Sequence, residues 1–190
     1  MKLSIGSIAS LALFLSLGYL PGFGQTKAAT CDPRLGLANT KPVGYTKGRW
    51  QDAEDAEGDA NPAAAREVRN VLKFGTNAIP LLIGCLRDEM RTKYHIWDYW
   101  PEPKVRDLAF SILCDLFSDR MGQQTLDGVI TWSDVQAESP DQPAWIAWGI
   151  YNDKHGQQHV QQVWLKVWAE NETRIYWDNS AKCFKVKETP

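Results

Sequence analysis

Three aromatic residues, Trp97, Tyr99 and Trp100, are the strongest candidates for recognition in this chain. They lie in residues 95–103 (HIWDYWPEP), a loop that two prolines close. Prolines restrict the backbone and so reduce the entropy that a loop loses on binding. Clustered aromatic side chains on such a loop are typical of binding hot spots. The loop is predicted either to bind a partner or to fold back and cover the neighbouring helices.

Patterns for metal or nucleophilic catalysis are incomplete. His155 and His159 have the four-residue spacing of zinc ligands in H-E-x-x-H, but Gly156 stands where the catalytic glutamate should be. The acidic run at residues 52–59 (DAEDAEGD) does not match the EF-hand spacing for calcium. No G-x-S-x-G motif and no phosphate-binding glycine loop occurs. We therefore expect no catalytic residue, metal or cofactor.

Paired carboxylates leave one enzymatic alternative open. Glycosidases need two carboxylates about 5–10 Å apart, and sugar rings stack on tryptophan. Four acids lie among the tryptophans: Asp98, Glu102, Asp141 and Asp178. The alternative hypothesis is therefore a small carbohydrate-binding protein or hydrolase that uses the aromatic loop 97–100 with nearby carboxylates.

The amino terminus predicts export. Residues 1–24 contain a positive start at Lys2, an uncharged run from Leu3 to Leu20, and small residues before a cut after Gly24. This order is that of a cleavable signal peptide. The predicted location is secreted or periplasmic. The formal net charge is −2, and cleavage makes it more negative because Lys2 is lost. A negative net charge gives no electrostatic attraction to nucleic acid or to an anionic membrane. The expected partner is another protein, with a small molecule or saccharide as an alternative ligand.

The four cysteines are disulfide candidates in an exported protein. They are Cys31, Cys85, Cys114 and Cys183. Four cysteines allow three pairings, and their long spacings do not choose among them. No C-x-x-C occurs, so a zinc ribbon or thioredoxin-type centre is not expected. Cys85 and Cys114 fall within amphipathic helices, where a cysteine is usually core or disulfide rather than nucleophile.

Hydrophobic periodicity predicts a mainly helical protein with a small carboxyl-terminal β-hairpin. Residues 129–132 are ambiguous between strand and loop. Four tryptophans at helical spacing (Trp145, Trp148, Trp164 and Trp168) are expected in the core rather than on a binding platform. Helices are predicted at 62–74, 77–87, 104–118, 142–151 and 156–170, and paired strands at 174–177 and 182–186.

Residues 62–118 resemble HEAT-type helical repeats. The stretch from Glu67 to Asp88 has the paired-helix pattern, and a second Val-Arg opens at Val105, 37 residues after Val68. The resemblance implies a short antiparallel helical stack. There is no clear third unit, so the carboxyl-terminal half must close the domain itself. That half, with GIYNDKHGQQHVQQVW and RIYWDNSAKCF, resembles exported bacterial proteins, and this resemblance implies no particular activity.

The combined prediction is a signal peptide (1–24), an irregular amino-terminal arm tethered through Cys31 (25–60), and one mainly helical domain (61–190). The predicted function is that of an exported, non-enzymatic domain that binds another protein.

Overall fold

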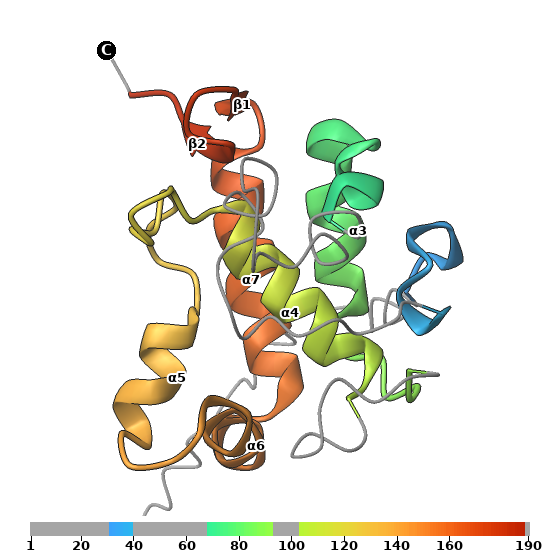
Figure 1. The fold of residues 1–190 in the computed structure, drawn as a ribbon, viewed down its shortest axis with the longest axis vertical. Helices are drawn as coiled ribbons and strands as arrows, with labels where there is room; N and C mark the ends of the chain where they lie inside the picture. Colours follow the sequence, from blue (N-terminus) through green and yellow to red (C-terminus); the bar gives the residue numbers. More distant parts are fainter. Residues whose placement is uncertain (1–30, 40–67, 93–102, 189–190) are drawn as a thin grey trace, which may run out of the picture.

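The computed structural model describes residues 31–39, 68–92 and 103–188. It is mainly helical and ends in a two-stranded antiparallel hairpin, as predicted (Figure 1). Residues 68–72 are helical. The other elements, in chain order, are the 3₁₀ turns η1 (Pro33–Leu35), η2 (Leu37–Asn39) and η3 (Gly75–Asn77), the helices α3 (Ala78–Cys85), α4 (Val105–Leu116), α5 (Trp132–Glu138), α6 (Ala144–His155) and α7 (Gln157–Asn171), and the strands β1 (Ile175–Asp178) and β2 (Cys183–Val186).

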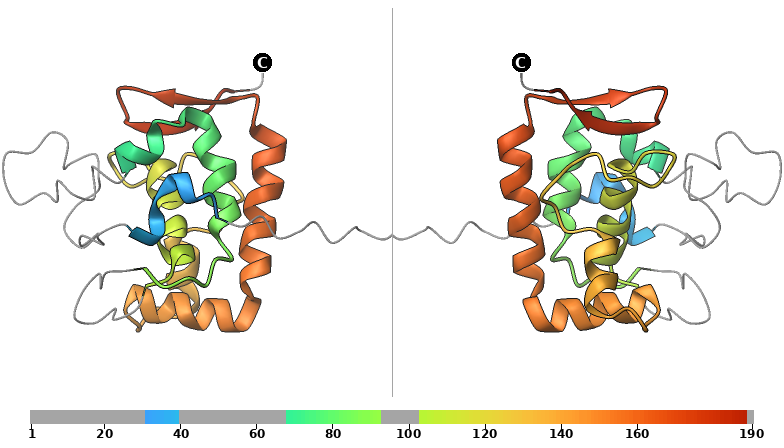
Figure 2. Two further views of the ribbon diagram at one scale, coloured as in Figure 1. Left: turned by 90° about the vertical axis from the view of Figure 1, so that its right-hand side faces the viewer. Right: turned by 90° about the vertical axis from the view of Figure 1, so that its left-hand side faces the viewer.

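Helix α7 runs along the length of the domain. The hairpin lies across one end of it and α6 lies across the other (Figure 2). Helix α3 packs against both α4 and α7. The strands pair from Ile175 with Val186 to Asp178 with Cys183. A two-stranded hairpin is marginal alone in water, so its contacts with α4 and η3 are needed to hold it.

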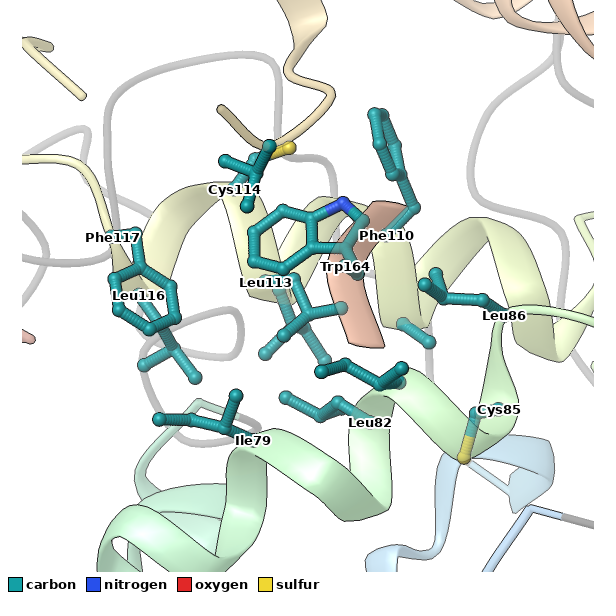
Figure 3. Packing of buried hydrophobic residues seen from close by; sticks show 14 of the residues in the cluster. Ile79, Leu82, Cys85, Leu86, Phe110, Leu113, Cys114, Leu116, Phe117 and Trp164 are labelled. Carbon is teal, nitrogen blue, oxygen red and sulfur yellow. The ribbon is translucent and has the colours of Figure 1, made fainter. Parts of the chain in front are cut away.

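The hydrophobic core forms around Trp164 of α7. Its indole is fully buried beside Phe110 and Leu113 of α4, with Leu82 of α3 near by (Figure 3). The indole Nε1 donates a hydrogen bond to the carbonyl of Ile130 at 3.2 Å, so its one polar atom is satisfied. The helix therefore closes the face that the α3–α4 pair leaves uncovered.

The predicted core tryptophans are largely confirmed. Trp148 of α6 is 3% exposed and stacks on Phe110 with ring centroids 4.0 Å apart. Trp168 is partly buried against the core, and Trp145 is half-buried. None of the four stands out from the surface as a platform.

Glycines lie at two places where the chain changes direction. Gly75 (φ +58°) ends the first helix, and Gly156 (φ +78°) separates α6 from α7. Side chains other than hydrogen strain the backbone at such angles. The 3₁₀ turn η3 leads directly into α3, and no side-chain hydrogen bond from Asn77 caps that helix.

Helix α5 was not predicted. Its hydrophobic pattern is short, with Val135 its buried residue. The signal that could have found it is the capping pair Thr131 and Asp134. The hydroxyl of Thr131 accepts from the Asp134 N–H, and the Asp134 carboxylate accepts from the Thr131 N–H. That reciprocal arrangement is a capping box.

One disulfide joins Cys31 to Cys85. It ties the described part of the amino-terminal arm to the end of α3, in agreement with the predicted tether through Cys31. Cys114 and Cys183 are free and buried, so their candidacy as disulfide partners is corrected. The two thiols have different neighbours: Cys114 lies by the Trp132 backbone, and Cys183 lies by the Thr125 side chain.

Residues 1–30 lie outside the described residues, and so the predicted signal peptide does too. Within residues 31–39, 68–92 and 103–188, no helix combines the length and the apolar character needed to cross a bilayer.

The cysteine arrangement predicts the outcome of a thiol titration. Unreduced protein in denaturant should release two thiols per chain, because one disulfide removes two of the four cysteines. The native protein should react much more slowly, because burial raises the pKa of both free thiols and shields them from reagent. The measurement is a colorimetric thiol assay in native and denaturing buffer. Four thiols in unreduced denatured protein would contradict the pairing.

Candidate functional site

The ends of the predicted aromatic loop are held side by side by two short segments, residues 88–92 and 103–106, here called the stem. Arg91 and Lys104 form an antiparallel bridge. Three backbone hydrogen bonds complete the stem: Thr92 N to Pro103 O at 2.9 Å, Val105 N to Met90 O at 2.9 Å, and Arg106 N to Asp88 O at 3.1 Å. The stem thus leads directly into the first turn of α4.

Local sequence explains the backbone conformation of both segments of the stem. Asp88 accepts a hydrogen bond from the Met90 N–H at 2.8 Å, the side-chain turn that aspartate commonly forms. Pro103 has no N–H and contributes only its carbonyl. On the α4 side, the Lys104 N–H donates to Asp107 Oδ2 at 2.7 Å, which caps the helix. These contacts define where the loop leaves the body of the domain.

Asp107 connects the start of α4 to α6. Its carboxylate is buried, with 5% of the residue exposed. While Oδ2 accepts from the Lys104 N–H, Oδ1 accepts from Trp148 Nε1 at 2.8 Å and from Arg106 Nε at 3.3 Å. A buried carboxylate is costly unless it is hydrogen-bonded and paired, and here it is both. The indole of Trp148 and the stem are therefore fixed by the same group.

Glu89 joins the stem to the beginning of α7. Its carboxylate accepts hydrogen bonds from Lys104, Arg106 and Gln157. Burial acts to raise the pKa of Glu89, but hydrogen bonds and positive charge from Lys104 and Arg106 outweigh it and hold the pKa below its usual range. The carboxylate is therefore ionised at neutral pH and remains able to hold its three donors.

The predicted binding residues Trp97, Tyr99 and Trp100 lie outside the described residues. The structure describes only the two ends from which they extend. Sequence reasoning missed the stem, because the donors to Glu89, and the Trp148 donor to Asp107, are distant along the chain. The one local signal was the three-residue spacing of Lys104 and Asp107 at a helix start.

The carboxylates of the hydrolase alternative are not assembled by the described residues. Asp98 and Glu102 lie outside them, and Asp141 is exposed in the turn before α6. Asp178 accepts hydrogen bonds from Ser180 and Ala181 in the hairpin turn and pairs with Lys185 at 2.8 Å. The Lys185 ammonium and these hydrogen bonds hold the pKa of Asp178 far below its usual range, so this carboxyl is a poor general acid.

The two spaced histidines meet at the junction of α6 and α7. Their ring centroids are 5.7 Å apart, and His155 Nε2 lies 2.9 Å from a carboxylate oxygen of Glu138. Glu138 also accepts from Lys154 at 2.7 Å; that bond and the one from His155 lower the pKa of Glu138. Within the described ranges, no group of three or more His, Cys, Asp or Glu residues is placed to hold a metal ion.

The described cysteines do not resemble activated nucleophiles. Burial raises the pKa of the Cys114 thiol well above its usual range, and the nearby Asp115 carboxylate acts in the same direction. Burial likewise raises the pKa of Cys183. A nucleophilic cysteine needs a lowered pKa and access to substrate. Both thiols therefore serve packing.

The contacts of Asp107 predict a specific loss of stability. In Asp107→Asn, one of the two positions that now accept must become an NH₂ donor, so the Lys104 N–H or the Trp148 indole N–H loses its acceptor. A buried polar group without a partner costs about 1–3 kcal/mol. Urea denaturation should show that decrease, whereas the control Asp153→Asn, at an exposed position on the same helix as Trp148, should change stability by less than about 0.5 kcal/mol. Equal midpoints for the two variants would contradict the role given to Asp107.

Comparison with known proteins places this chain in no family: no protein-family model, curated protein or solved structure matches it. The HEAT-like resemblance of residues 62–118 therefore stays a prediction from the residues. The function has to be inferred from the contacts described above and from the sequence.

Proposed function

We propose that this protein is an exported domain that binds another protein and carries out no catalysis itself. The Cys31–Cys85 disulfide is compatible with export, because disulfides persist mainly in oxidising compartments. The signal-peptide pattern of residues 1–24 supports the same location from the sequence. The site of action would be the periplasm or the outside of the cell.

The observation that carries the proposal is the stem. A loop pays an entropic cost when it becomes ordered on binding, and fixing its ends reduces that cost. Here three backbone hydrogen bonds join the ends, Glu89 ties them to α7, and Asp107 ties them to α6. The sequence between the ends contains Trp97, Tyr99 and Trp100. A loop with fixed ends loses less entropy when it becomes ordered on a partner, so the stem supports a role in recognition for the aromatic sequence between its ends.

The chemistry of the described residues favours binding over the hydrolase alternative. Asp178 is engaged in its turn and paired with Lys185. Protein partners are also well matched to tryptophan and tyrosine, which are the residues most enriched at binding hot spots. A saccharide ligand for the same aromatic segment remains the competing hypothesis, and the test below separates the two.

The proposal predicts that a loop variant loses binding without losing stability. Trp97→Ala combined with Trp100→Ala should abolish capture of the partner from envelope extract and leave the melting temperature nearly unchanged. Truncating a hot-spot aromatic costs roughly 2–4 kcal/mol of binding free energy. The matched control is Tyr176→Ala, an aromatic that is 38% exposed on β1 and should keep the partner.

Two results would overturn the proposal. A fall in melting temperature of roughly 10 °C or more, about 3–5 kcal/mol for a domain of this size, would show that the aromatics are part of the core. Binding of an oligosaccharide that the double variant loses, with no protein captured by the parent, would favour the carbohydrate-binding alternative.

A further inference from the structure

A polar cleft lies between the disulfide-tethered segment and the turn that follows the helix at residues 68–72. Its volume is about 370 Å³, within the range of small-molecule sites. It is remote in sequence from the stem and shares no residue with it. The lining residues are Arg34, Leu35, Gly36, Asn39, Asn70, Lys73 and Phe74.

The lining combines positive charge, amides and one aromatic ring. Arg34 and Lys73 contribute cationic groups, and Asn39 and Asn70 contribute carboxamides. Among the described lining residues, none is a carboxylate. Phe74 supplies an apolar face, with its ring centroid 5.8 Å from the Arg34 guanidinium carbon.

Asp32 orients Arg34. Its carboxylate accepts from the Arg34 backbone N–H at 2.9 Å, from Nε at 3.0 Å and from Nη2 at 2.5 Å. Hydrogen bonds from the Arg34 side chain and backbone lower the pKa of Asp32 to about 2, so Asp32 is ionised across the neutral range. Among the described residues, no acceptor for Nη1 of Arg34 is found.

Lys73 supplies the second cation. Its ammonium donates to Asn70 Oδ1 at 2.8 Å, and an ammonium has three hydrogens to donate. Among the described residues, Asp32 neutralises one of the two cations, so the described part of the cleft carries one net positive charge. A ligand that carries one negative charge would balance it.

We propose that this cleft binds a sugar acid: a small organic carboxylate with hydroxyl groups beside the carboxyl. The carboxylate lies between Arg34 and Lys73, the hydroxyls bond to the amides of Asn39 and Asn70, and the apolar face of the sugar ring covers Phe74. Each part of the lining then has a matching part of the ligand.

Other ligand classes leave part of the cleft unmatched. A neutral sugar leaves the remaining positive charge unbalanced. Inorganic phosphate leaves the amides and the ring of Phe74 unused and fills little of the volume. An amino acid brings an ammonium group, for which the described lining residues offer no carboxylate. The sugar acid is the class that uses the charge, the amides and the ring together.

The cleft depends on the disulfide. One wall is the segment from Arg34 to Asn39, which Cys31 ties to α3 and which Leu35 and Leu37 anchor in the core. The opposite wall belongs to residues 70–74. Reducing the disulfide frees the first wall to move away from the second. Binding should therefore be weaker in reduced protein.

Calorimetric titration of the oxidised full-length chain tests the proposal, with D-glucuronate as the probe and D-glucose and inorganic phosphate as controls. Glucuronate should bind measurably up to millimolar concentrations, and both controls should bind at least tenfold more weakly. Lys73→Gln should weaken glucuronate binding by about tenfold or more, because it removes a charged donor. Lys166→Gln, at an exposed lysine of α7, is the matched control and should bind as the parent does.

The proposal is overturned by any of four results: no heat with glucuronate, equal binding of glucose, equal binding of phosphate, or unchanged affinity in Lys73→Gln. Because Lys73 is exposed, its replacement should not affect folding, and a thermal melt of each variant checks this. A second variant, Asn39→Ala, should weaken glucuronate while leaving the weak binding of phosphate unchanged, since only the sugar acid uses the amide.

Discussion

The burial of Trp164 is the interaction on which the rest of the fold depends. Helices α3 and α4 pack against each other, but this pair still leaves apolar surface uncovered. Helix α7 places the Trp164 indole over that surface. The same helix face places Gln161 beside the last turn of α3, where its amide donates to the Ile83 carbonyl at 2.9 Å. The same carbonyl accepts from the Leu86 N–H at 3.2 Å, so Gln161 is its second donor. Packing and polar satisfaction therefore fix α7 in one position.

The position of α7 in turn fixes the stem. Gln157, in the first turn of α7, reaches Glu89, and Glu89 holds Lys104 and Arg106 at the entry to α4. These contacts place three distant parts of the chain around one carboxylate. A single exposed ion pair adds little stability, but a network that joins separate elements restricts their relative movement. The described contacts thus brace the base of residues 93–102 from more than one side.

The amino-terminal segment is held by different means. Residues 33–39 form only 3₁₀ turns, which contribute little stability alone. Burial of Leu35 and Leu37 and the disulfide from Cys31 attach them to the helices. The cleft lined by Arg34 and Lys73 is a consequence of that attachment. Covalent tethering therefore creates a surface that the short turns could not form unaided.

Sequence periodicity predicted the longer helices and the hairpin, because a spacing such as that of Val160, Trp164 and Val167 reports which face of a helix is buried. It did not predict the short helix α5, which buries only Val135. Tertiary structure alone decided which residues meet. Asp107 and Trp148 are 41 residues apart, Glu89 and Gln157 are 68 apart, and Cys31 and Cys85 are 54 apart. A hydrophobic pattern identifies the buried side of an element without identifying what covers it, so those pairings became visible only when the packed helices brought them together.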